Sequence, residues 1–187
     1  MNMYFLLPDL NLALAVGSLF LAVITIVLYV DYFLWKGKYF SDTIKEVSWP
    51  VLISVTIGSV VMSLVYSEYF GFVPCSLCWL QRIAIYPQAL LSVLAFKVQD
   101  HTKFPVYGIG LSLFGFVVAV YHYIYQALPR ESSSSALMPC LVDGSNADCA
   151  VKVMNVFGFV TFPFLSAVTF AFLIILYLYM LRLNKGK

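Results

Sequence analysis

Five long apolar stretches constrain the fold of this 187-residue chain more than any other feature. A helix needs about 20 mostly apolar residues to cross the hydrocarbon core of a bilayer. The stretches cover residues 10–30, 49–66, 79–96, 104–127 and 157–181. Only 11% of the residues are charged, against about 25% in soluble domains. We therefore expect an all-α, polytopic membrane protein, with Pro50 in the first helical turn of the second span, where proline is tolerated.

The first apolar stretch could be a cleaved signal peptide or a retained membrane span. A signal peptide carries a positive region before its apolar core, yet no Lys or Arg precedes Lys36. The stretch is also long enough to cross the bilayer. We expect a retained span with its N-terminus outside.

The basic residues predict the orientation of the spans, because cytoplasmic loops are enriched in Lys and Arg. Residues 31–48, residues 97–103 and the C-terminal tail would lie on one side. This side holds eight of the eleven basic residues: Lys36, Lys38, Lys45, Lys97, Lys103, Arg182, Lys185 and Lys187. We expect it to be cytoplasmic, in a plasma or inner membrane. The net charge of +2, without a basic cluster, gives no indication of a nucleic-acid partner.

All four cysteines belong to the outward side or its boundary. Cys75 and Cys78 end one loop, and Cys140 and Cys149 lie in the loop 128–156, whose serine run predicts mobility. This distribution is typical of an oxidising compartment. Spacing alone leaves three interpretations open: two structural disulfides, a tetrahedral zinc site, or a relay of two exchanging disulfides. Oxidising surroundings disfavour zinc, because they compete for the thiols.

Two ionisable residues fall inside the spans. Arg82 lies four residues after Cys78, on the same helix face about one turn deeper. Its charge would stabilise a Cys78 thiolate and an acceptor beside it, although Arg82 could also extend to the interface as an anchor. His122 precedes Gln126 by one turn. It is either a hydrogen-bond partner for a bound ligand or a structural contact between helices.

Three segments together resemble the DsbB family of quinone-linked thiol oxidases. Residues 71–82 read Gly-Phe-Val-Pro-Cys-Ser-Leu-Cys-Trp-Leu-Gln-Arg and are similar to the branch with the signature Pro-Cys-x-Leu-Cys-Trp-x-Gln-Arg. Residues 122–129 resemble the His-x3-Gln-x2-Pro stretch of that family. Residues 148–150 and 157–163 resemble the approach to its last span.

The resemblance implies a four-helix core with one cysteine pair in each of two outward loops. This core would be residues 49–187, and residues 1–48 would add one membrane helix and a cytoplasmic loop. A DsbA-like protein of thioredoxin fold would be the partner, and ubiquinone or menaquinone in the lipid bilayer would accept the electrons. The acceptor would be bound by Arg82, His122 and Gln126.

The resemblance also assigns a role to each cysteine. Cys140 would meet the partner, and Cys149 would be released from it as a thiolate. Cys75 would receive the exchange, and Cys78 would pass electrons to the quinone. The separation of Cys140 and Cys149 by only eight residues leaves little room for the loop helix of some relatives.

Two other classes of protein stay open. Vitamin K epoxide reductase-like proteins also combine two cysteine pairs with a quinone. Their loop pair precedes their membrane pair, however, which is the reverse of the order here. A non-enzymatic membrane protein with two structural disulfides would not need Arg82 one turn after Cys78.

Overall fold

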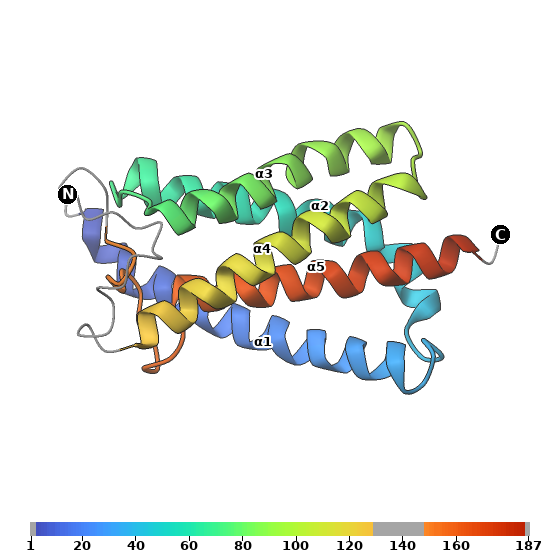
Figure 1. The fold of residues 1–187 in the computed structure, drawn as a ribbon, viewed down its shortest axis with the longest axis horizontal. Helices are drawn as coiled ribbons and strands as arrows, with labels where there is room; N and C mark the ends of the chain where they lie inside the picture. The colour runs from blue at the N-terminus through green and yellow to red at the C-terminus, as the bar shows by residue number, and fades with distance from the viewer. Residues whose placement is uncertain (1–2, 129–147, 186–187) are drawn as a thin grey trace.

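A computed structural model describes residues 3–128 and 148–185 of the chain, and within these residues it is helical, without a named strand. Its five long helices run up and down (Figure 1). They are α1 (Leu7–Phe33), α2 (Ser41–Leu64), α3 (Ser76–Lys97), α4 (Lys103–Ala127) and α5 (Phe162–Lys185). Each is long and apolar enough to cross a membrane. The expected all-α, polytopic membrane fold is confirmed.

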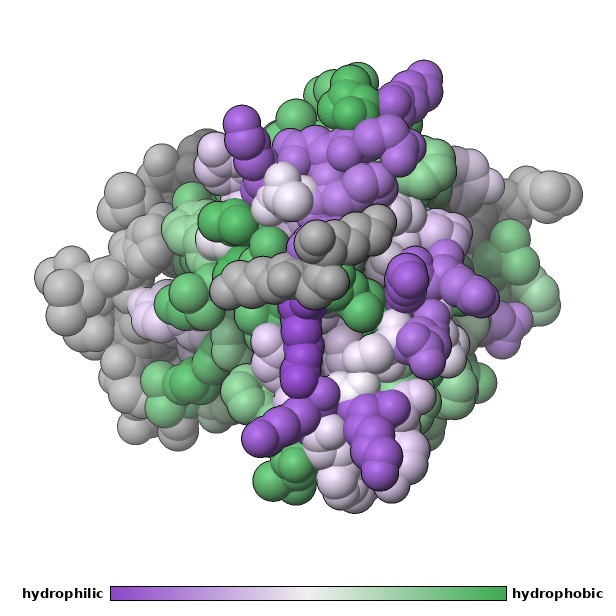
Figure 2. All heavy atoms as spheres, turned by 90° about the vertical axis from the view of Figure 1, so that its right-hand side faces the viewer, coloured by the Kyte–Doolittle hydropathy of each residue, from purple (hydrophilic) through white to green (hydrophobic). Residues whose placement is uncertain are grey.

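Helices α2 to α5 form a bundle in which each helix packs against the next one along the chain, and α5 also packs against α2. The additional helix α1 lies along α5. One end of the bundle carries the N-terminus and the links α2–α3 and α4–α5, and the other end carries the C-terminus (Figure 1). Hydrophilic side chains gather on the end near the C-terminus (Figure 2). The cysteine-bearing links and this polar face are therefore at opposite ends.

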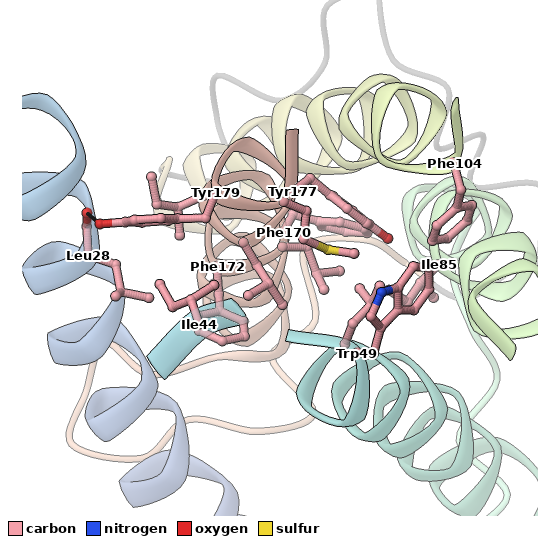
Figure 3. Packing of buried hydrophobic residues seen from close by; sticks show 14 of the residues in the cluster. Leu28, Ile44, Trp49, Ile85, Phe104, Phe170, Phe172, Tyr177 and Tyr179 are labelled. Carbon is pink, nitrogen blue, oxygen red and sulfur yellow. Dashed lines mark hydrogen bonds between the residues drawn. The ribbon is translucent and has the colours of Figure 1, made fainter. Parts of the chain in front are cut away.

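Two tyrosines of α5 belong to the buried core of the bundle. Tyr177 and Tyr179 are fully buried, and Figure 3 shows Tyr179 reaching toward α1. The Tyr179 hydroxyl donates to the backbone oxygen of Leu28 at 3.2 Å and to the carboxylate of Asp31 at 2.7 Å. The buried Asp31 carboxylate also accepts from the backbone N–H groups of residues 39 and 40. This carboxylate therefore ties the turn between α1 and α2 to α5.

A second polar contact joins three helices inside the bundle. The side-chain oxygen of Gln88 on α3 accepts from Ser112 of α4 at 3.0 Å and from Tyr177 of α5 at 2.9 Å. Buried polar groups without water need such partners, and interhelical hydrogen bonds of this kind hold membrane helices together.

The expected position of Pro50 is wrong. Helix α2 begins at Ser41 rather than at Trp49, so Pro50 lies inside the helix. The apolar stretch marks the part of the helix suited to lipid, whereas the helix itself continues through the polar turns that begin with Ser41 and Asp42. Hydropathy therefore located the span but not the start of the helix.

The expected start of the last span is also wrong. Helix α5 begins at Phe162 rather than at Phe157. Before it, an isolated antiparallel bridge joins Val156 to Val160, and Phe157 and Gly158 have φ angles of 55° and 80°. Right-handed helix excludes positive φ, so these apolar residues form a turn instead.

Gly115 allows the close approach of α4 to α5, which predicts a large effect of a single methyl group. A Cβ atom at Gly115 would overlap the ring of Phe170, whereas a Cβ at Gly110 would meet nothing within 4 Å. We expect Gly115→Ala to destabilise the folded protein by about 1–3 kcal/mol, as overpacking of a core does. Thermal unfolding in detergent measures the effect, with Gly110→Ala as the matched control. Equal melting temperatures for the two variants would contradict this prediction.

Candidate redox site

The first cysteine pair is positioned by the start of α3. Cys75 is the N-cap residue, with φ −72° and ψ 169°, and its sulfur accepts from the backbone N–H of Cys78 at 3.3 Å. The two Sγ atoms lie 2.7 Å apart, and both cysteines are free thiols in the structure. A disulfide needs about 2.05 Å between its sulfurs. An oxidant that removed two electrons and two protons would therefore convert this dithiol into a disulfide with only a small side-chain movement.

A histidine of α4 lies beside Cys75. The Nε2 atom of His122 is 3.9 Å from the Cys75 sulfur and 3.1 Å from the backbone oxygen of Cys149. The side-chain nitrogen of Gln81 lies 3.2 Å from Nδ1 of the same ring. The side-chain nitrogen of Gln126 also approaches the ring, 3.3 Å from Nε2. His122 therefore connects the end of α3 to Cys149.

Cys149 is buried beside the dithiol. Cys149 is disulfide-bonded and only 1% exposed. It packs in one hydrophobic cluster with Cys75 and Tyr125. The side-chain nitrogen of Gln126 donates to the Cys149 backbone oxygen at 3.2 Å. Cys140 and the serine run 132–135 lie outside the described residues.

The Cys75 thiol, which precedes the membrane-spanning part of α3, is strongly acidified. The hydrogen bond with Cys78 lowers the pKa of Cys75 more than burial raises it, and His122 lowers it further. The N-terminus of a helix also favours negative charge. Cys75 therefore ionises more readily than an ordinary cysteine.

Arg82 occupies the opposite side of the pair from His122. Arg82 is 9% exposed, and its guanidinium donates to Ser63 of α2 twice, from Nε to Oγ and from Nη2 to the backbone oxygen, each at 2.9 Å. It also lies over the ring of Trp79, 5.2 Å from the centroid. A guanidinium has five N–H donors. Among the described residues the hydrogen bonds occupy two of them, which leaves others for a ligand.

Cys78 and Arg82 line the same cavity. This cavity has a volume of about 450 Å³ and lies between α1, α2, α3 and α5. Its walls are mostly apolar, including Met62, Leu165 and Phe170. Cavities of 300–1,000 Å³ with a few polar groups in an apolar lining are typical of sites for small organic ligands. A second cavity, of about 320 Å³, is lined by Cys75, Cys78, His122, Gln126 and Cys149.

Comparisons with known proteins decide the family. The family described as "Disulfide bond formation protein DsbB" matches residues 45–180. The chain belongs to the DsbB family. Membership assigns the chain to disulfide-bond formation at a membrane and implies an oxidoreductase role.

Several curated relatives share this assignment. "Disulfide bond formation protein C" of Bacillus subtilis (strain 168) is 34% identical over 140 residues, which cover 75% of this chain and 93% of that protein. "Probable disulfide formation protein" of Oceanobacillus iheyensis is 34% identical, over 67% of this chain and 81% of that protein. "SPbeta prophage-derived disulfide bond formation protein B" of Bacillus subtilis is 38% identical, over 58% and 68%. No solved structure matches the chain.

The structure divides the predicted site residues of this DsbB-family protein between two sides of the dithiol. Arg82 shares the larger cavity with Cys78, whereas His122 and Gln126 lie with Cys75 and Cys149. The roles of His122 and Gln126 in quinone binding stay predictions. Sequence reasoning missed Ser63 and Gln81. Gln81 belongs to the Pro-Cys-x-Leu-Cys-Trp-x-Gln-Arg signature, but its contact with His122 depends on how α3 faces α4.

The structure also bears on the alternative uses of the four cysteines. Cys75, Cys78 and His122 offer three ligand atoms within 4.8 Å of one another and could hold a metal ion. A zinc site made of four cysteines needs four thiolates, whereas Cys149 is in a disulfide. A Cys75–Cys78 disulfide can form at this separation, so two structural disulfides stay an alternative.

The acidified Cys75 thiol predicts a distinct pH dependence. In a variant with Cys140 and Cys149 replaced by alanine, we expect Cys75 to ionise well below the usual pKa of about 8.5. Its thiolate is then present at neutral pH and is lost as the pH falls through the lowered pKa. Ultraviolet thiolate absorbance, with Cys75→Ser subtracted, measures this titration. Cys78→Ala should raise the pKa by removing the largest cause, and an unchanged pKa would contradict the assignment.

Proposed function

We propose that this protein is a thiol:quinone oxidoreductase that reoxidises a DsbA-like partner of thioredoxin fold outside the cytoplasm. One observation carries this proposal: the dithiol has an apolar cavity with a buried arginine on one side and the disulfide-bonded Cys149 on the other. A site with two such sides suits the transfer of electrons from a disulfide-exchange partner to a lipid-soluble acceptor. The cysteine pair would serve as the intermediate carrier.

The exchange begins at the loop disulfide. A partner thiolate attacks Cys140, and Cys149 leaves as a thiolate, so a mixed disulfide joins Cys140 to the partner. The partner's second cysteine, as a thiolate, then attacks the sulfur of the partner's first cysteine in the mixed disulfide. This releases Cys140 and the oxidised partner. The loop pair now carries two electrons.

The next exchange moves these electrons inward. The Cys149 thiolate attacks Cys75 of the Cys75–Cys78 disulfide, and Cys78 leaves as a thiolate. Attack of Cys140 on Cys149 restores the loop disulfide and releases Cys75. The protein then has a free Cys75–Cys78 dithiol and a loop disulfide, and the unbonded sulfurs of Cys75 and Cys78 beside a disulfide-bonded Cys149 are compatible with that stage.

The acceptor side completes the cycle. A quinone, when bound, accepts two electrons and two protons from the dithiol, and the Cys75–Cys78 disulfide re-forms. Arg82 would hold the polar ring of the acceptor with its remaining N–H donors, and its charge would favour developing negative charge on the ring oxygens. The apolar wall residues suit the tail of ubiquinone or menaquinone.

We also propose that the cysteine end of the bundle faces outward. The end with the C-terminus carries the excess of basic residues and would be cytoplasmic. Thioredoxin-fold oxidases that form disulfides in secreted proteins act in oxidising compartments. The orientation therefore places the exchange where such a partner would meet it.

Removal of the Arg82 charge tests the acceptor site. Purified protein is assayed for oxidation of a reduced thioredoxin-fold protein together with quinone reduction. We expect Arg82→Gln to raise the KM for quinone by about tenfold or more, because hydrogen bonds to charged groups contribute about 1.5–3 kcal/mol. Exchange with the partner should change little. Ser63→Ala, which keeps the charge, is the matched control, and an unchanged KM in Arg82→Gln would place the acceptor elsewhere.

The burial of Cys149 predicts which loop cysteine meets the partner. Cys149 is only 1% exposed, so we expect a protein thiolate to attack Cys140 and Cys149 to leave. We expect Cys149→Ser to accumulate a mixed disulfide through Cys140, seen as a reductant-sensitive band on a non-reducing gel. Cys140→Ser should accumulate far less. Trapping through Cys149 instead would reverse the two roles while leaving the relay intact.

A further inference from the structure

Helix α1 supplies one wall of the cavity that contains Cys78 and Arg82. Ala13, Gly17 and Leu21 of α1 line this cavity, and Gly58 and Met62 of α2 line it from another side. The family match begins at residue 45 and therefore does not include α1. We propose that α1 is part of the acceptor site and that Gly17 leaves the space into which the apolar tail of the quinone fits. This inference rests on the proposed function and deepens it.

The shape of the cavity follows from how α1 and α2 are joined. Near the cysteine end, the hydroxyl of Tyr66, just after α2, donates to the side-chain oxygen of Asn11 on α1. Near the other end, Asp31 of α1 accepts from the backbone of residues 39 and 40, just before α2. Contacts therefore hold the two helices together at both ends, and the cavity lies between these contacts.

Small residues keep the middle of this space open. A Cβ atom added at Gly17 or at Gly58 would meet nothing within 4 Å. Ala13 and Ser18 add further short side chains to the α1 wall. A larger side chain at these positions would extend into the cavity rather than displace a packed neighbour.

The lining indicates what kind of molecule the cavity suits. Cys78, Gln81 and Arg82 form a polar group on α3, whereas α1 contributes mainly apolar atoms. A molecule with a polar redox-active ring and a long apolar tail satisfies both parts. An acyl chain of a phospholipid would fill the apolar part, but it has no redox-active group that could accept electrons from the thiol of Cys78. We therefore commit to a quinone with an isoprenoid tail as the occupant.

Filling the cavity from α1 tests this inference. Gly17→Leu is compared with Gly110→Leu, which makes the same replacement on α4 where a Cβ also meets nothing within 4 Å and which does not line the cavity. We expect Gly17→Leu to raise the KM for a long-tailed quinone by about tenfold, since steric overlap in a packed site has effects of this size. The KM for a tail-less analogue and the exchange with the partner should stay near wild type.

A labelling experiment on the unmodified chain provides a second readout, which does not depend on the folding of a variant. A quinone with a photoreactive tail should label the α1 peptide, and excess unlabelled quinone should suppress the labelling. Labelling confined to α2 and α5, labelling that quinone does not suppress, or an unchanged KM in Gly17→Leu would overturn the role of α1. In those cases Arg82→Gln would still impair quinone reduction. If the wild-type protein reduced no quinone, the proposed function would itself be wrong.

Discussion

Water is absent from the core of a bilayer, so a buried polar side chain in this protein needs a hydrogen-bond partner within the protein. The structure meets this constraint at a few places that together fix the bundle. Gln88 joins α3 to α4 and α5, Asp31 joins the α1–α2 turn to α5, and Arg82 joins α3 to α2. Each of these bonds specifies the rotation of a helix that hydrophobic packing alone would leave poorly defined.

The redox site depends on those rotations. The start of α3 presents Cys75 toward α4 and Cys149, while Arg82 turns toward α2. The start of one helix thereby places the dithiol between Cys149 on one side and Arg82 on the other. The hydrogen bond between the two sulfurs lowers the pKa of Cys75, and the N-terminus of the helix also favours a thiolate there. A dithiol in a symmetrical environment would lack this difference between its two thiols.

Much of this arrangement could be predicted from the sequence, because the bilayer selects long apolar stretches and the spacing of Cys75, Cys78 and Arg82 is local to one helix. The helix starts could not be predicted. Hydropathy does not report where a helix enters the polar region, and it does not detect the positive φ of Phe157. The contact of His122 with Cys149 joins distant segments, and nothing in the sequence predicted it. Ser63 carried no signal, since its role arises from the packing of α2 against α3.

The burial of the inner sulfurs has a consequence for the selectivity of electron flow. Cys75 is 5% exposed and Cys149 is 1% exposed, so small thiols dissolved in the surrounding medium have almost no direct access to either. If soluble thiols could reduce these cysteines, oxidant would be consumed without forming a disulfide in the partner protein. Here the packing of α4 and of the segment after Cys149 shields Cys75 and Cys149 from such thiols. The direction of electron transfer then depends on which molecules can reach these sulfur atoms, in addition to any difference in reduction potential between the two cysteine pairs.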